Sequence, residues 1–315
     1  MMQCVATPEH LAANAAGAAL NPALDSLLTR ESGPVTLMLH GFKYCPFHTP
    51  SAQDPDLRDP HRLIYSDSPE TTCDRVASWP ALLNRPGPTL GIAWPAMHDG
   101  RGSLAAMRGF GQVYERARQI ARQVARLADR IAILDPTRRI DLIGHSLGGR
   151  IALAALPLMQ HAEPSRVLLW GAAERANVAA TQIANASART VIVNVRAHSN
   201  ARFDSMFEWV APGVGPALGA VGQIDGISSL TLDDPVTEKA LASRGLPLDT
   251  APRGKCHWSF YTRAGTGPLY AALLDQPGIW TANRIAGLSR IEGVTPPSLV
   301  ATLSALLPAN LMRGA

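Results

Sequence analysis

The stretch that decides the fold is Ile-Asp-Leu-Ile-Gly-His-Ser-Leu-Gly-Gly-Arg, residues 140–150. Apolar residues lead into the pentapeptide Gly-His-Ser-Leu-Gly at positions 144–148, and a strongly apolar run over residues 151–159 follows at once. This order predicts a buried strand, a sharp turn that carries Ser146, and a helix. A serine on such a strained turn has its hydroxyl lifted clear of the backbone, and the two flanking glycines leave room for neighbouring elements. The stretch therefore indicates a nucleophile elbow, with Ser146 as the candidate nucleophile.

The rest of the chain alternates short apolar runs with helical segments. Residues 35–39, 89–94, 166–171 and 190–195 are typical of buried strands, whereas residues 78–84, 109–134 and 173–186 have helical patterns. This alternation predicts right-handed βαβ units and a mostly parallel sheet covered by helices on both faces. Residues 1–30 are alanine-rich and predict a peripheral helical segment, and residues 43–88 and 205–256 are long enough to be loops or lid-like insertions over the active site. We expect one domain over residues 1–315.

The composition is that of a globular protein without a membrane span. Hydrophobic residues make up 46% of the 315 residues, which is ample for a core. No apolar run approaches the roughly 18 residues of a membrane-spanning helix, and residues 1–19 have no basic start or apolar core of a signal peptide. The widely spaced Cys4, Cys45, Cys73 and Cys256 predict free thiols and a cytoplasmic location, although Cys45 and Cys73 could pair within one loop.

The charge of the chain does not call for a nucleic-acid partner. The net charge is +4 and is carried almost wholly by arginine. Four arginines repeat at every fourth position of the long helical segment, which predicts a solvated helix face: Arg118, Arg122, Arg126 and Arg130.

Two backbone N–H groups are candidates to bind an oxyanion: one follows an early strand, and the other follows the candidate nucleophile. The strand over residues 35–39 ends at His40-Gly41-Phe42. In serine hydrolases of this architecture, the residue after such a His-Gly pair directs its amide N–H into the oxyanion hole, and the residue after the nucleophile supplies the second N–H. Phe42 and Leu147 are therefore the candidate oxyanion-hole residues.

A serine hydroxyl needs a histidine to remove its proton and a carboxylate to orient that histidine. In hydrolases built on this elbow, the acid and then the histidine follow the serine along the chain. Asp204 lies in the loop after the second predicted strand beyond the elbow and is the favoured acid, with Asp233 and Asp234 as competitors. The one histidine beyond Asp204 is His257, which makes it the candidate base.

No metal or cofactor is expected. The loop over residues 43–88 carries histidines and aspartates, but their spacing fits neither a zinc pair on a helix nor a calcium loop: His48, Asp54, Asp56, Asp59 and His61.

Together these motifs resemble those of the α/β-hydrolase superfamily, most closely uncharacterised bacterial members with a Trp-Pro strand end before a long helix. The resemblance covers residues 35–274 and is sharpest at His40-Gly41-Phe42, Trp94-Pro95, residues 144–149, Asp204 and His257. It implies an α/β-hydrolase fold with an eight-stranded type of sheet and a Ser146–His257–Asp204 triad. The chain departs from the pattern in that no convincing strand directly precedes His257, and in the length of residues 43–88.

The expected function is hydrolysis of carboxylic esters, with a small-molecule ester as the partner and an acyl-enzyme intermediate on Ser146. A thioesterase or acyltransferase would use the same residues, and a non-catalytic binding protein with the same fold is the alternative from another class. Residues 209–221 carry no charge and are interrupted by glycine and proline. This apolar segment either packs against the core or roofs an acyl pocket, and the second reading predicts a preference for uncharged, apolar acyl groups.

Overall fold

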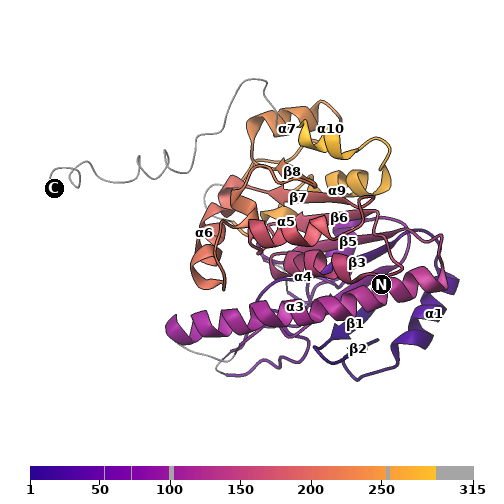
Figure 1. Ribbon diagram of the computed structural model, residues 1–315. Helices are drawn as coiled ribbons and strands as arrows, with labels where there is room; N and C mark the ends of the chain where they lie inside the picture. The colour runs from indigo at the N-terminus through magenta and orange to yellow at the C-terminus, as the bar shows by residue number, and fades with distance from the viewer. Residues whose placement is uncertain (53, 72, 99–102, 253–255, 289–315) are drawn as a thin grey trace.

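The structure, a computed structural model, describes residues 1–52, 54–71, 73–98, 103–252 and 256–288 of the chain, and of residues 103–107 it describes the backbone alone (Figure 1). Residues 289–315 of the expected single domain lie outside the described residues.

A single eight-stranded sheet runs through the described chain in the order β2-β1-β4-β3-β5-β6-β7-β8. The pairing of β1 with the edge strand β2 is antiparallel, and the other six pairings are parallel. The predicted fold class, an α/β protein with a mostly parallel sheet between helices, is confirmed. The strands are β1 (Met2–Ala6), β2 (Leu11–Ala12), β3 (Val35–Leu39), β4 (Thr89–Ala93), β5 (Ile140–His145), β6 (Arg166–Trp170), β7 (Val191–Arg196) and β8 (Ile227–Thr231).

Helices cover both faces of the sheet and bury a separate apolar cluster on each (Figure 1). Successive strand residues point to opposite faces, so Leu142 of β5 lies in one cluster and Ile143 in the other. The first cluster is covered by α1 (Leu20–Arg30), α3 (Ser103–Leu134), α4 (Leu147–Ala155) and α5 (Ala176–Ala184). The second is covered by α2 (Trp79–Leu83), α7 (Pro235–Ala242), α8 (Ser259–Thr262), α9 (Thr266–Asp275) and α10 (Ala282–Ala286).

The structure differs from the sequence-based expectation in two segments. Residues 1–30, expected to be helical, contribute β1 and β2 before α1, because the short, mixed β1 sequence is stabilised as a strand by parallel pairing with β4. Residues 205–256, expected as a long loop or insertion, contain the end of α6 (Ala201–Val210), the 3-10 helix η3 (Leu218–Ala220), β8 and α7. His257 therefore follows β8 at a distance, with α7 between them.

The long helix α3 packs one apolar side into the first cluster and leaves arginines in solvent. Arg118, Arg122 and Arg126 are exposed, and Arg118 pairs with Glu115 one turn earlier on the same helix. In the described part of the chain, no helix is both long and apolar enough to cross a membrane. The four cysteines, all within the described ranges, carry free thiols, so Cys45 and Cys73 are not joined.

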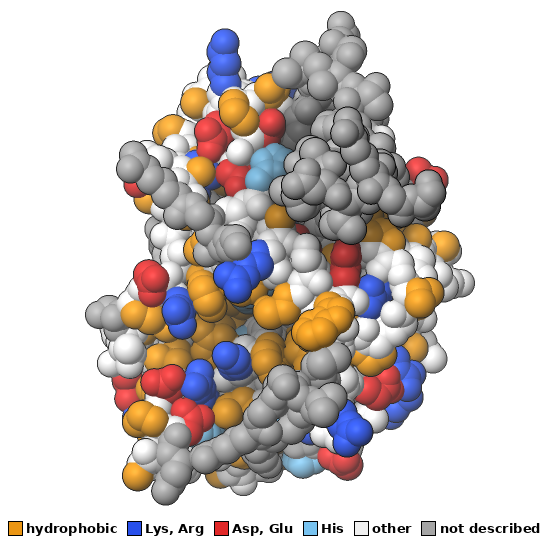
Figure 2. All heavy atoms as spheres, turned by 90° about the vertical axis from the view of Figure 1, so that its left-hand side faces the viewer, with side chains coloured by type: hydrophobic (Ala, Val, Ile, Leu, Met, Phe, Trp, Pro, Cys, Tyr) orange, Lys and Arg blue, Asp and Glu red, His pale blue; other side chains and the backbone are white. Residues whose placement is uncertain are grey.

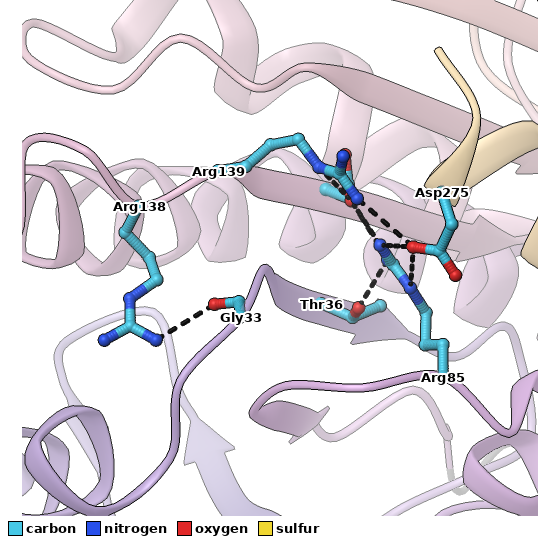
Figure 3. A network of polar contacts seen from close by, with 7 residues as sticks. Gly33, Thr36, Arg85, Arg138, Arg139 and Asp275 are labelled. Atoms are coloured by element: carbon cyan, nitrogen blue, oxygen red, sulfur yellow. Dashed lines mark hydrogen bonds and ion pairs between the residues drawn. The ribbon is translucent and has the colours of Figure 1, made fainter. Parts of the chain in front are cut away.

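A buried ion-pair network lies at the end of the sheet where β5 begins (Figure 3). Arg85, at the end of the long loop, donates to the carboxylate of Asp141 at 2.9 Å, to that of Asp275 at 2.6 Å and to the Thr36 hydroxyl at 2.8 Å. Arg139 lies 3.2 Å from the Asp275 carboxylate. Because Asp141 is the second residue of β5 and Ser146 follows its last, the network and the elbow lie at opposite ends of one strand.

Candidate active site

Ser146 stands on the turn between β5 and α4 in a backbone conformation that few residues other than glycine adopt. Its φ is 55° and its ψ is −120°. The turn is held by the Ser146 N–H, which donates to the Trp170 carbonyl at 3.0 Å, and by the Ser146 carbonyl, which accepts from Gly149 and Ala173. Strain of this kind persists only where the surroundings enforce it, and it is concentrated at functional sites. The predicted strand, strained turn and helix are thus all present around Ser146.

The turn that follows β3 lies directly against the elbow. A Cβ atom added to Gly41 would lie 2.7 Å from Ser146 Cβ, and one added to Gly148 would lie 1.9 Å from the Leu39 carbonyl oxygen. Any side chain at either position would force the two turns apart. Glycine at 41 and 148 therefore lets the β3 turn contact the elbow.

His40 fixes the peptide plane between Gly41 and Phe42. The Trp94 N–H donates to His40 Nε2 at 3.0 Å, so this nitrogen carries the lone pair and Nδ1 carries the hydrogen, which it donates to the Gly41 carbonyl at 2.9 Å. Burial lowers the pKa of His40 to about 3, which keeps the ring neutral. Because a trans peptide is planar, a fixed Gly41 carbonyl also fixes the opposite direction of the Phe42 N–H.

The backbone amides of Phe42 and Leu147 are the candidate hydrogen-bond donors to an oxyanion. Among the described residues, neither N–H donates to another group. Phe42 follows the turn that touches Ser146, and Leu147 is the first residue of α4, where a helix has unpaired N–H groups. The two candidate oxyanion donors therefore come from the two turns that meet at Ser146.

The structure brings His257 beside the elbow. Its ring centroid is 4.6 Å from that of His145 and 4.8 Å from that of Phe203, on which it stacks. Its Nδ1 lies 2.7 Å from Asn200 Oδ1, which can only accept, so Nδ1 carries the hydrogen and Nε2 the lone pair. Burial, and secondly the nearby His145, lower the pKa of His257 well below its usual value. No hydrogen bond joins His257 to Ser146 in the described chain, and such bonds often tighten only when substrate binds.

In the described part of the chain no hydrogen bond joins Asp204 to His257, and Asn200 is hydrogen-bonded to both. The Asn200 Nδ2 group donates to Asp204 Oδ1 at 3.0 Å. Burial raises the pKa of the Asp204 carboxyl to about 6, and this effect exceeds the opposing effects of the Asn200 hydrogen bond and the Arg196 charge. The two competing acids, Asp233 and Asp234, accept hydrogen bonds from backbone N–H groups. Asp233 accepts the N–H groups of residues 198 and 199, and Asp234 caps the start of α7.

Two residues that the sequence reasoning did not assign to the site hold His257 in place. Asn200 binds its ring, and the His145 Nε2 group donates to the His257 carbonyl at 2.9 Å. Burial lowers the pKa of His145 to about 4, so this ring stays neutral. The Cys256 N–H also donates to the Ser199 carbonyl at 3.0 Å, which ties the histidine loop to the turn that carries Asn200.

Aromatic rings surround the two turns. Phe110 of α3 packs edge-on against Phe42 at 5.3 Å and against Phe207 of α6 at 6.3 Å between ring centroids. Figure 2 looks onto the side that carries α6 and the start of α3, and hydrophobic side chains gather there around a hollow. The ring of Phe42 therefore lies between other rings, with Phe110 at its edge and His98 stacked on it at 5.7 Å between centroids.

The uncharged segment over residues 209–221 is partly packed into the core and partly exposed to solvent. Leu218 is 1% exposed and belongs to the first apolar cluster, whereas Trp209 and Val214 are 74% and 81% exposed. Arg175 fastens the segment to the domain by donating to the carbonyls of Ala211 and Gly215. Its later part packs into the core, and its middle faces solvent.

The histidines and aspartates of the long loop bind neighbouring groups and do not converge on one point. Arg58 pairs with Asp54 and Asp56, and His61 Nε2 lies 3.1 Å from the Cys4 carbonyl. In the described ranges, no group of three histidine, cysteine or acidic side chains is placed to hold a metal ion.

No protein-family model and no curated protein matches the chain. Among solved structures, MenH from S. aureus is similar at 10% identity and a TM-score of 0.37, over 78% of this chain and 96% of that one. TT1662 from Thermus thermophilus is similar at 13% identity and a TM-score of 0.37, over 78% of this chain and 89% of that one. An acetyl xylan esterase is similar at 12% identity and a TM-score of 0.31, over 77% of this chain and 95% of that one. Scores this low carry no conclusion about activity.

Proposed function

We propose that this protein is a serine hydrolase that cleaves carboxylic esters through an acyl-enzyme intermediate on Ser146. The observation that carries the proposal is the strained conformation of Ser146 at the end of β5, where the turn after β3 and the loop of His257 both approach it. A structural serine would gain nothing from a φ of 55°, whereas for a nucleophile this conformation lifts the hydroxyl away from the backbone, here in a residue that is only 7% exposed.

In this mechanism, Ser146 Oγ forms a bond to the acyl carbon while His257 Nε2 accepts the hydroxyl proton. The carbonyl π electrons move onto the oxygen, which the N–H groups of Phe42 and Leu147 hold. When the intermediate collapses, the ester C–O bond breaks and His257 gives the proton to the departing alcohol. Water then releases the acyl group by the same steps, and Asp204 is the acid that supports the charged imidazole.

We further propose that the substrates have uncharged, apolar acyl groups. The ring of Phe110 packs against that of Phe42 on the proposed oxyanion turn and against that of Phe207. An acyl chain placed against them would leave water, and each buried methylene would contribute up to about 0.8 kcal/mol. A charged acyl group would lose its hydration against these rings.

The experiment is hydrolysis of p-nitrophenyl butyrate by the wild type, Ser146→Ala and the control Ser205→Ala. Ser205 is exposed on α6, so its replacement should leave turnover unchanged. Ser146→Ala should lower turnover by roughly 10⁴-fold or more, as loss of a triad nucleophile does, with an unchanged thermal unfolding curve. A folded Ser146→Ala protein that keeps wild-type turnover would refute the proposal.

A further inference from the structure

Asn200 occupies the place beside the histidine where a triad has its carboxylate. Its Oδ1 accepts from His257 Nδ1 at 2.7 Å, and its Nδ2 donates to Asp204 Oδ1 at 3.0 Å. Asn200 and Asp204 are both buried. Asn200 ends the 3-10 helix η2 (His198–Asn200), and Asp204 lies one turn later on α6. The contact is therefore built from two rigid, adjacent elements.

An amide has two chemically different ends, and its orientation selects the tautomer of the histidine. An ionised carboxylate can only accept, so Asp204 requires the Nδ2 end of Asn200 to face it. The Oδ1 end must then face His257, and an acceptor there places the ring hydrogen on Nδ1. This tautomer leaves the lone pair on Nε2, where a base for Ser146 must have it.

We propose that Asn200 is the residue that holds the His257 ring directly, and that Asp204 is a positioning residue that acts through Asn200. The inference rests on the proposed serine hydrolase mechanism and deepens it. When His257 takes the proton of Ser146, the ring becomes positive. The Asn200 carbonyl, polarised by the Asp204 carboxylate behind it, stabilises that charge across one intervening amide.

The charge state of Asp204 should therefore appear in the pH dependence of activity. Two charged groups act on this carboxyl: Arg196 of β7 lowers its pKa, and Glu208 of α6 raises it. From η3, the backbone at Gly219 packs on the carboxylate and brings no charge. Once protonated, Asp204 could also donate, and Asn200 would lose its fixed orientation. With a carboxyl pKa of about 6, kcat/KM should fall as the pH drops through that value.

The test compares kcat/KM for p-nitrophenyl butyrate between pH 4.5 and 8.5 in four proteins: wild type, Asp204→Asn, Asn200→Asp, and the double variant Asn200→Asp/Asp204→Asn. Asp204→Asn should lose roughly 10²-fold, less than the roughly 10⁴-fold caused by loss of a directly bonded carboxylate, and its acid limb near pH 6 should disappear. The double variant exchanges the two groups, with the carboxylate now on His257, and should recover most of the lost activity. Thermal unfolding of each variant is the control for folding.

A folded Asp204→Asn enzyme with the wild-type rate and profile would overturn the role of Asp204, and so would a double variant no better than Asp204→Asn. If Asp204→Asn does not fold, Asn200→Asp decides. In this variant two carboxyl groups would lie side by side, and like charges so close together cannot both ionise easily. The pKa of the pair should therefore rise and move the acid limb upward, and an unmoved limb would overturn the role of Asn200. Failure of the proposed function would look different, because the wild type would then lack Ser146-dependent hydrolysis altogether.

Discussion

At the scale of single residues, the site depends on histidines that burial keeps neutral and that hydrogen bonds fix in one tautomer. His40 binds the Gly41 carbonyl, His145 binds the His257 carbonyl, and His257 binds Asn200. The rings of His40 and His145 therefore fix neighbouring turns of backbone, whereas the ring of His257 is itself fixed by Asn200. Of these three, only His257 is proposed to move a proton.

Replacing His40 should damage the oxyanion hole without removing any group that touches substrate. In His40→Asn, the shorter side chain cannot hold both the Gly41 carbonyl and the Trp94 N–H, so the Phe42 N–H loses its direction. Loss of one oxyanion donor costs about 10²- to 10³-fold in kcat. We expect kcat for p-nitrophenyl butyrate to fall up to about 10²-fold with little change in KM.

The matched control for this prediction is His61→Asn. His61 is also buried, and burial lowers its pKa to about 4, but it binds the Cys4 carbonyl away from the elbow. This variant should lose stability and keep kcat. Equal kcat in the folded His40→Asn and His61→Asn proteins would contradict the role assigned to His40.

At the scale of elements, hydrophobic periodicity was sufficient to predict the helices and strands that bury a continuous apolar run. The strand over residues 35–39 has the predicted bounds, and α2 lies between a Ser78 cap and Asn84 in the left-handed region, as the 78–84 pattern indicated. Strand β1 was missed because its Met-Gln-Cys-Val-Ala sequence is short and mixed, and its partner β4 lies more than 80 residues away.

The site was less predictable than the fold because side-chain contacts depend on turn geometry. The order of Ser146 and His257 along the chain was enough to nominate both, and the structure brings His257 near the elbow. Asn200 was not predicted because a triad is expected to contain a carboxylate beside its histidine. The four-residue step from Asn200 to Asp204, at the start of a helix, was the signal that could have revealed it.

The aromatic cluster formed by α3, α6 and the β3 turn should set the length of the acyl chain. Phe110→Ala removes the ring between Phe42 and Phe207 and should lengthen the pocket. Across p-nitrophenyl esters from acetate to decanoate, the best substrate should become longer by two or more carbons, at about 0.8 kcal/mol for each buried methylene. Ile133→Ala, at the exposed far end of the same helix, is the control. An identical chain-length profile in both variants would leave the cluster without a role in specificity.

At the scale of the whole molecule, the two ends of the central strand β5 have different roles, one in stability and the other in the proposed reaction. The Arg85 network lies where β5 begins, and Ser146 lies where it ends (Figure 3). Strain in the elbow costs free energy, and buried interactions elsewhere must offset it. Residues at the two ends should therefore affect different measured quantities.

Arg85→Met should lower stability and leave turnover intact. It would leave the fully buried Asp141 with Arg139 alone, at 3.4 Å. Removal of one partner from a buried ion pair costs about 3–5 kcal/mol. Urea unfolding should show this loss, with kcat of the folded protein within about twofold of wild type. Arg62→Met, which removes a solvent-exposed pair with Glu70, should change neither quantity noticeably. A wild-type unfolding midpoint for Arg85→Met would contradict the role of the network.

The central claim is that Ser146 is a nucleophile activated by His257, and covalent labelling tests it most directly. The wild type, Ser146→Ala and His257→Ala would be treated with a fluorophosphonate, and the modified residue would be located by mass spectrometry of peptides. We predict one label, on Ser146, that is absent in Ser146→Ala and forms at least about 10²-fold more slowly in His257→Ala, because general-base assistance contributes 10²–10⁴-fold. A wild-type protein that stays unlabelled, or carries its label on another residue, would contradict the claim.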